Sequence, residues 1–94
     1  MTGLDGDWDV RRISGALPPL RGVRKRIAGA SGETVVLGGP GIPFDVDGLE
    51  LHYRSPLGFL VDLLEPRGAA FHGRATAFGR TYGTFEMTRR PLAT

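Results

Sequence analysis

One lysine lies in a pattern that could support chemistry. In the stretch "LRGVRKRIAG", residues 20–29, Lys25 alternates with Val23 and Ile27, so a regular strand would place these three side chains on one face. A lysine in an apolar interior would have a lowered pKa and could anchor a carboxylate or form a Schiff base. Two simpler arrangements are a bulge that turns the lysine outward and, our preferred interpretation, an edge strand whose cations face water.

Several other residues are assigned to the same interior as candidate ligand contacts. They are aromatic and apolar side chains that alternation or position along the predicted strands directs inward. No arrangement of serine or cysteine with histidine carries a local catalytic signature, so no catalytic residue is assigned. The candidate ligand-binding residues are Lys25, Leu51, Tyr53, Phe59, Tyr82 and Phe85.

The histidines and carboxylates do not form a metal-binding spacing. His52 and His72 are far apart in the chain. His52 falls on the polar face of its predicted strand and is expected to be solvated, and His72 would point outward if its neighbour Phe71 points inward. Asp45 and Asp47 alternate onto an outward face and are expected to be solvated too. Asp62, within "FLVDLLE", is the carboxylate most expected to be partly buried. Neither a metal nor a cofactor is therefore predicted.

A basic cluster precedes the middle of the chain. Arg21, Arg24, Lys25 and Arg26 could contact phosphates, but no aromatic residue is interleaved with them to stack on bases. The net charge is only +2. A nucleic-acid partner is therefore not expected, and the glycine-rich stretch 38–43 is predicted to be a loop because it lacks the lysine of a phosphate-binding loop.

Composition limits the class of protein. The chain has 94 residues, which fits a single β domain over 1–94, and 15 glycines and 7 prolines leave little room for long helices. There is no cysteine, so a disulfide framework is excluded. No apolar run is long enough for a membrane span, and the acidic N-terminus does not resemble a signal peptide. We expect a cytoplasmic protein.

Alternating residues predict several strands. The first covers 7–14, with Trp8 and Val10 on one face, and Ile13 fits this strand only if a bulge intervenes. A second strand is predicted over 21–28, and "ETVVL" forms a third after a turn at "SGET".

Two hairpins are predicted in the second half of the chain. The first joins strands around Asp47 and Gly48, and the second, which turns at Gly79, ends the chain as a meander.

The segment 55–64 has a different pattern. Leu57, Leu60, Val61 and Leu64 follow helical spacing, and the flanking Ser and Pro residues suit the start of a helix. A short helix near 56–64 is therefore predicted, with a buried strand over 59–64 as the alternative. In the helix, Asp62 would be exposed.

A tryptophan near the start provides a family resemblance. The sequence "GDW", with Gly6 and Trp8, resembles the Gly-x-Trp signature of lipocalins and related calycin barrels. In that family an arginine near the end of the last barrel strand packs across the indole, and Arg89 or Arg90 in "FEMTRR" matches it here. The resemblance implies a structural role for these four residues and an up-and-down barrel.

Together these patterns predict a mainly β fold, a small antiparallel barrel or strongly bent sheet of six to eight strands. The favoured function is binding of a small apolar or amphipathic molecule in the barrel. The alternatives are a cofactor-independent isomerase or cyclase that uses Lys25, Tyr53 or Tyr82, and a protein-interaction module with a filled core. A cavity of roughly 300 Å³ or more would favour the ligand site. The ligand and the oligomeric state are not predicted.

Overall fold

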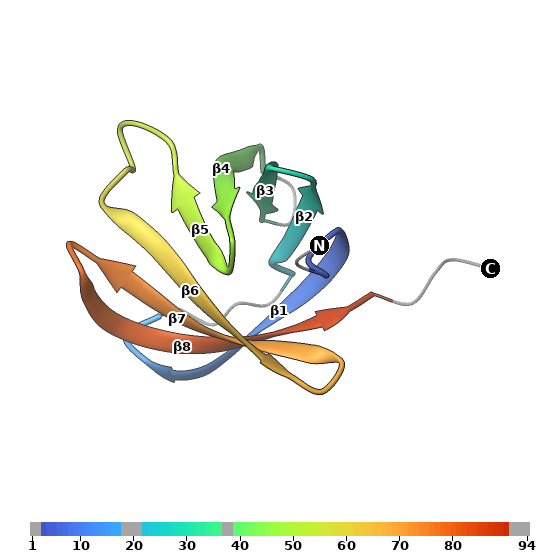
Figure 1. The fold of residues 1–94 in the computed structure, drawn as a ribbon. Coiled ribbons are helices and arrows are strands. Elements are labelled where there is room, and N and C mark those ends of the chain that lie inside the picture. Colours follow the sequence, from blue (N-terminus) through green and yellow to red (C-terminus); the bar gives the residue numbers. More distant parts are fainter. Residues whose placement is uncertain (1–2, 18–21, 37–38, 91–94) are drawn as a thin grey trace.

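Eight antiparallel strands form the fold (Figure 1). The computed structural model describes residues 3–17, 22–36 and 39–90. The strands formed by these residues are β1 Gly6–Gly15, β2 Arg24–Ala28, β3 Ser31–Val35, β4 Gly41–Asp47, β5 Glu50–Tyr53, β6 Leu60–Arg67, β7 Ala70–Ala77 and β8 Arg80–Arg89.

The sheet closes on itself. Each strand pairs with the next in the chain, and β1 also pairs with β8, from Trp8 opposite Arg89 to Gly15 opposite Gly83. The mainly β prediction is confirmed, and the closed barrel is the form that it takes. Closure leaves no free sheet edge, so every strand is hydrogen-bonded on both sides. The described part of the chain contains no helix that could cross a membrane.

Tight glycine turns join the strands at one end of the barrel. Each of these two-residue turns begins with a glycine at positive φ, namely Gly29 (65°), Gly48 (61°) and Gly68 (60°). The second confirms the predicted hairpin between β4 and β5. The first corrects the sequence prediction, because the turn lies at 29–30 and the residues of "SGET", 31–34, belong to β3.

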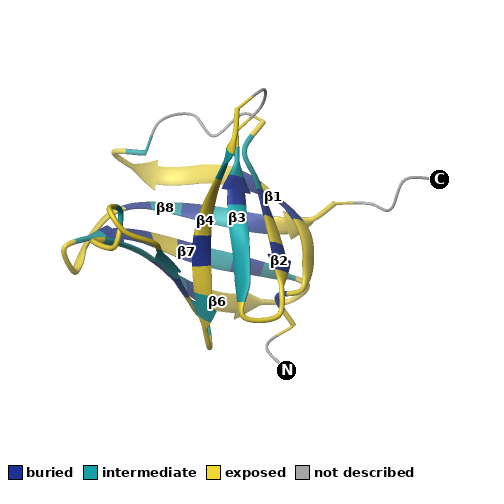
Figure 2. Cartoon of the chain, turned by 90° about the horizontal axis from the view of Figure 1, so that it is seen from above, coloured by how far each residue is buried: buried dark blue, intermediate teal, exposed yellow. Residues whose placement is uncertain are grey.

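The predicted alternation of β1 is confirmed (Figure 2). Trp8 and Val10 are buried and their immediate neighbours along the strand are exposed. A shift of register between Arg12 and Ser14 provides the bulge that Ile13 requires, and the Ile13 side chain is exposed. A bulge lets a strand bend, and β1 pairs with β2 near its start and with β8 over the rest of its length.

The helix predicted near 56–64 is wrong. Residues 54–59 form a turn-rich connection, and Leu60–Arg67 is strand β6, paired with β7 along its whole length. The spacing was ambiguous because residues four apart, such as Leu60 and Leu64, share a face in a strand as well as in a helix. Barrel closure decides between them, since β5 and β7 need a strand between them. The alternative strand over 59–64 is the better prediction.

Candidate functional site: a cavity beside a buried polar cluster

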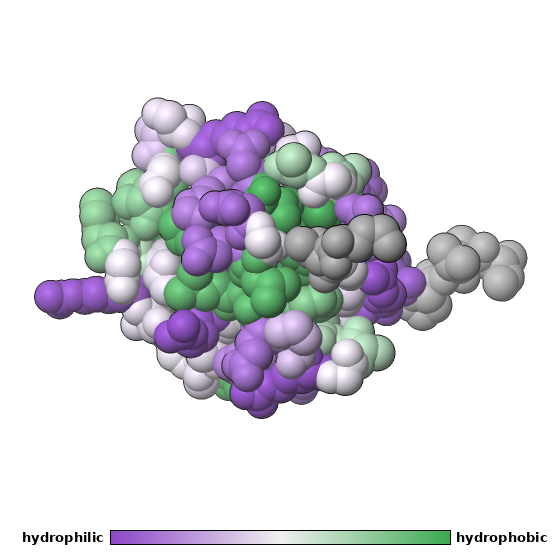
Figure 3. Space-filling view, viewed as in Figure 1, coloured by the Kyte–Doolittle hydropathy of each residue, from purple (hydrophilic) through white to green (hydrophobic). Residues whose placement is uncertain are grey.

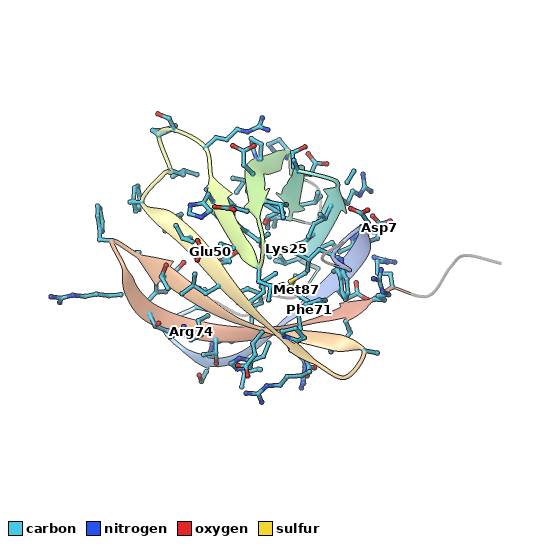
Figure 4. The ribbon with its side chains drawn as sticks, viewed as in Figure 1. Asp7, Lys25, Glu50, Phe71, Arg74 and Met87 are labelled. Carbon is cyan, nitrogen blue, oxygen red and sulfur yellow. The ribbon has the colours of Figure 1, made fainter. Side chains whose placement is uncertain are left out.

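The two ends of the barrel differ. At the closed end, defined by the turns 29–30, 48–49 and 68–69, apolar side chains fill the interior. Trp8, Leu4 and Met87 are fully buried there, and the Trp8 ring meets Phe71 edge-on at 5.3 Å between centroids. Figure 4 shows Phe71 and Met87 toward the middle of the barrel. The open end is defined by the described residues of the four other connections, 16–17, 22–23, 36, 39–40, 54–59 and 78–79.

A cavity of about 170 Å³ lies toward the open end. It is smaller than the roughly 300 Å³ that we set as favouring a ligand site, but the interior is not solid here. Its wall is almost entirely apolar, with polar groups contributed by a few side chains. The lining residues are Val10, Leu17, Val23, Lys25, Thr34, Ile42, Tyr53, Leu57, Leu60, Asp62, Ala75, Tyr82 and Phe85.

Four of these residues form a connected polar cluster. The Lys25 ammonium donates hydrogen bonds to Thr34 Oγ1 at 2.7 Å and to Tyr53 Oη at 2.8 Å, and it lies 3.1 Å from Asp62 Oδ2. Tyr53 donates to Asp62 Oδ2 at 3.2 Å. These contacts match the three N–H donors of Lys25 with three oxygens. The buried charge is paired and hydrogen-bonded, as a buried charge must be.

The predicted edge position of Lys25 is wrong. Its side chain is only 4% exposed and points into the barrel (Figure 4). Strand β2 pairs with both β1 and β3, so it has no edge at which the lysine could face water. Alternation with Ile27, which is also buried, places Lys25 inside, and Asp62 balances the charge there.

The ionic state of the lysine also differs from the expectation for an apolar interior. Burial alone would lower the pKa of Lys25, but the attraction of Asp62, with contributions from Tyr53, outweighs it and leaves the pKa raised. Burial raises the pKa of Tyr53 as well. Both groups therefore keep their protons at neutral pH. A Schiff base, which needs the neutral amine, is disfavoured at Lys25.

One oxygen of the cluster remains open. Among the described residues, hydrogen bonds and the ion pair reach Asp62 through Oδ2, and none reaches Oδ1. Among the described residues no fully buried side-chain nitrogen or oxygen lacks a hydrogen-bond partner, which agrees with some solvent access for Oδ1. Since Asp62 lines the cavity, this oxygen presents a hydrogen-bond acceptor to it.

The structure brings together only some of the predicted ligand contacts. Tyr53, Tyr82 and Phe85 line the cavity with Lys25. Leu51 is instead fully buried in the core and is not part of the cavity wall. Phe59 lies outside the cavity as well, where its ring stacks on Phe78 at 4.7 Å.

Two polar residues of the cavity were missed as site residues. Thr34 gave no distinctive signal in the sequence. Asp62 did, because it alternates with Leu60 and Leu64 and so shares their face in a strand. The helix interpretation directed it outward instead. Lys25 and Asp62 come from strands far apart in the sequence, and closure of the barrel brings them together.

The predicted structural residues meet at the closed end. The Arg89 guanidinium lies 4.3 Å from the centre of the Trp8 ring and donates hydrogen bonds to the Gly3 and Asp5 carbonyls. Gly6 has φ of 127°, and a Cβ there would meet the Arg89 guanidinium, so glycine is required at this position.

Arg90 does not cover the indole. It faces outward, with its guanidinium 3.5 Å from Asp9. Arg89 is therefore the arginine of the contact that the sequence resemblance implied. This constellation closes one end of the barrel, and the cavity inside the barrel lies toward the other end.

The polar residues on the outer face include one loose group of metal-type ligands. Asp47, Glu50 and His52 place ligand atoms within 4.8 Å of one another, and the group is exposed to solvent. His52 Nε2 lies 2.9 Å from Glu50 Oε1, and Asp45 is bound to Arg54 at 2.8 Å. Two of the three ligands are thus already joined to each other, and the neighbouring Asp45 is held by an arginine.

Comparisons with protein-family models, with curated proteins and with solved structures find no match to this chain.

Proposed function

We propose that this protein binds one small, uncharged amphipathic molecule in the open-end cavity, with an apolar body in the barrel and a hydrogen-bond donor, such as a hydroxyl, against Asp62. The observation that carries the proposal is an apolar cavity with the Asp62 carboxylate in its wall, where the hydrogen bond from Tyr53 and the contact with Lys25 both engage Oδ2. Ligand pockets commonly have this composition, in which a few polar groups orient an otherwise apolar molecule.

The size of the cavity limits the part of the ligand that lies inside. Apolar cavities of roughly 150 Å³ hold a benzene ring, and the cavity here is of about 170 Å³. The enclosed part of the ligand is therefore a single ring or a short chain. A longer molecule would extend through the open end.

The charge balance of the cluster favours an uncharged ligand. Lys25 is already paired with Asp62, so an anionic ligand would compete with a carboxylate that is in place. A cationic ligand would add an unbalanced charge to a mostly apolar site, which is costly. This proposal replaces the carboxylate anchor that the sequence suggested for Lys25. A neutral donor needs no change in the ion pair.

A lipocalin-like relationship is part of this proposal. The barrel with a buried Trp8, the glycine at Gly6 and the arginine on the indole agree with the resemblance seen in the sequence. Binding is preferred over an isomerase or cyclase because the raised pKa values of Lys25 and Tyr53 disfavour either group as a base. A protein-interaction module with a filled core is also less favoured, because the barrel contains a cavity.

The test compares three molecules of nearly the same shape: benzyl alcohol, benzoate and benzylamine. We expect benzyl alcohol to bind best, with chemical-shift changes confined to residues that line the cavity. Ala75→Leu should remove binding because it fills the cavity, whereas Ala28→Leu, on the exposed face of β2, should not. Binding of benzoate alone would favour the lysine anchor, and binding that Ala75→Leu leaves unchanged would contradict the proposed site.

A further inference from the structure

The exposed apolar side chains of the barrel gather at its open end. Among the described residues, each large hydrophobic side chain with substantial exposure lies in an open-end connection or within three residues of one. In Figure 1 the connection from β5 to β6 and the tip of the β7–β8 hairpin lie on the left, away from the β6–β7 turn at the lower right. These residues are Ile13, Val36, Ile42, Phe59, Phe78 and Tyr82.

Two stacked phenylalanines are the most prominent of them. Phe78 is 80% exposed and its ring lies flat on that of Phe59, with 8° between the ring planes. Phe78 also adopts a positive φ of 52°, a backbone conformation that is unfavourable for a residue with a large side chain. Its amide donates to the Phe59 carbonyl at 2.9 Å, which ties the two connections together. The fold thus holds an aromatic pair in water at the rim of the barrel.

The charges are distributed unequally between the two ends. The open-end connections contain no aspartate or glutamate in the sequence. The guanidinium groups of Arg12, Arg24 and Arg80 stand near this end, and none of them forms an ion pair with a described residue. At the closed end, by contrast, Asp47 and Glu50 flank one of the turns.

We propose that the open end of the barrel docks on an anionic lipid surface, with Phe59 and Phe78 inserted at the interface and the neighbouring arginines over the headgroups. Exposed apolar patches bordered by polar residues commonly mark interaction sites, and basic residues are attracted to anionic lipid. Figure 3, in the same view as Figure 1, shows hydrophobic residues at the left edge of the molecule, where the tip of the β7–β8 hairpin lies.

Lipid fits this end better than a protein partner does. The apolar side chains are divided among four connections and the strand residues next to them rather than gathered on one strand or hairpin. A fluid interface can accept separate side chains without a matching shape, whereas a protein would need a complementary surface that also covers the mouth. Docking in this orientation would direct the cavity toward the lipid.

Co-sedimentation with vesicles tests the proposal without any ligand for the cavity. We expect the protein to bind vesicles of equal parts phosphatidylcholine and phosphatidylserine, and to bind phosphatidylcholine alone much more weakly. Added salt should weaken binding because it screens the headgroup charge. Phe78→Asn should reduce the partition coefficient about tenfold or more, since it removes an inserted ring. Asparagine tolerates the positive φ at this position, so the fold should be retained.

Charge reversal provides the matched control. Arg80→Glu, at the open end, should lower binding at least about fivefold. Arg67→Glu, at another exposed arginine beside the closed-end turn, should have little effect. The proposal is overturned if neither vesicle is bound, if the two arginine variants behave alike, or if Phe78→Asn binds like the parent. Sedimentation as a dimer that Phe78→Asn dissociates, without vesicle binding, would instead identify a second copy as the partner.

Discussion

At the level of single residues, the ion pair between Lys25 and Asp62 makes each side chain depend on the other. Both are almost fully buried, so removing one leaves an uncompensated charge in the interior. We expect Lys25→Met to lower the free energy of unfolding by about 3 to 5 kcal/mol. This reverses the effect expected for an unpaired lysine, whose removal would leave stability unchanged or improve it.

The double variant Lys25→Met with Asp62→Leu should recover much of that loss, because no buried charge remains. Urea denaturation of the two single variants and the double variant measures the coupling between the sites. Additive losses would show that the two groups do not interact as the 3.1 Å distance requires.

The two C-terminal arginines should differ in the same kind of measurement. Arg89 stacks on Trp8 and bonds two carbonyls, whereas Arg90 makes a long, exposed contact with Asp9. Replacing Arg89 by lysine keeps the charge but removes the planar group, and should cost about 1 to 2 kcal/mol. Arg90→Lys should change little, since exposed pairs contribute little.

Fluorescence gives a second check on Arg89. Trp8 is fully buried, so its emission should lie to the blue of free tryptophan in the parent. Arg89→Lys should shift or brighten that emission, and Arg90→Lys should not. The same loss of stability in both variants would contradict the assignment of Arg89 to the indole.

At the level of strands, a glycine in β7 shapes the cavity wall. A Cβ at Gly73 would collide with the ring of Phe85, which lines the cavity from β8. Gly73→Ala should displace this ring and lower stability by roughly 1 to 3 kcal/mol, as overpacking does. It should also alter the binding of benzyl alcohol. Gly58→Ala, where a Cβ has ordinary space, is the matched control and should change binding little.

Most strands could be predicted because alternation and glycine turns are local signals. The hairpin at Gly48 and the bulge beside Ile13 follow directly from them. The segment 60–64 could not be decided locally, since Leu60 and Leu64 suit both periods. Only pairing with β5 and β7 settles it, and that pairing depends on the whole barrel.

The candidate site was predictable in part for the same reason. The phase of Lys25 with Ile27 correctly pointed inward, but its partner Asp62 lies 37 residues along the chain and was assigned to a helix face. Without that partner, burial of the lysine looked too costly, and the edge interpretation was preferred. Closure of the barrel supplies both the partner and the absence of an edge.

At the level of the whole molecule, the cluster should make stability depend on alkaline pH. The pKa of Lys25 and that of Tyr53 are raised above their ordinary values of 10.5 and 10.0, so the folded state holds these protons more tightly than the unfolded chain does. The unfolded chain therefore releases them first as the pH rises. By linkage, the free energy of unfolding is highest below about pH 10 and decreases as the pH rises through the folded-state values.

Urea denaturation from neutral pH to above about pH 11 measures this dependence. The parent should be constant at first and then lose stability steeply. A variant with Lys25→Met, Asp62→Leu and Tyr53→Phe together lacks both groups with a raised pKa and leaves no unpaired buried charge, so its decline should be shallower. A parent whose stability stays level through this range would show that Lys25 and Tyr53 titrate alike in the folded and unfolded chains, which is incompatible with their burial beside Asp62. If the triple variant loses stability with pH as steeply as the parent does, titrating groups outside the cluster cause the loss.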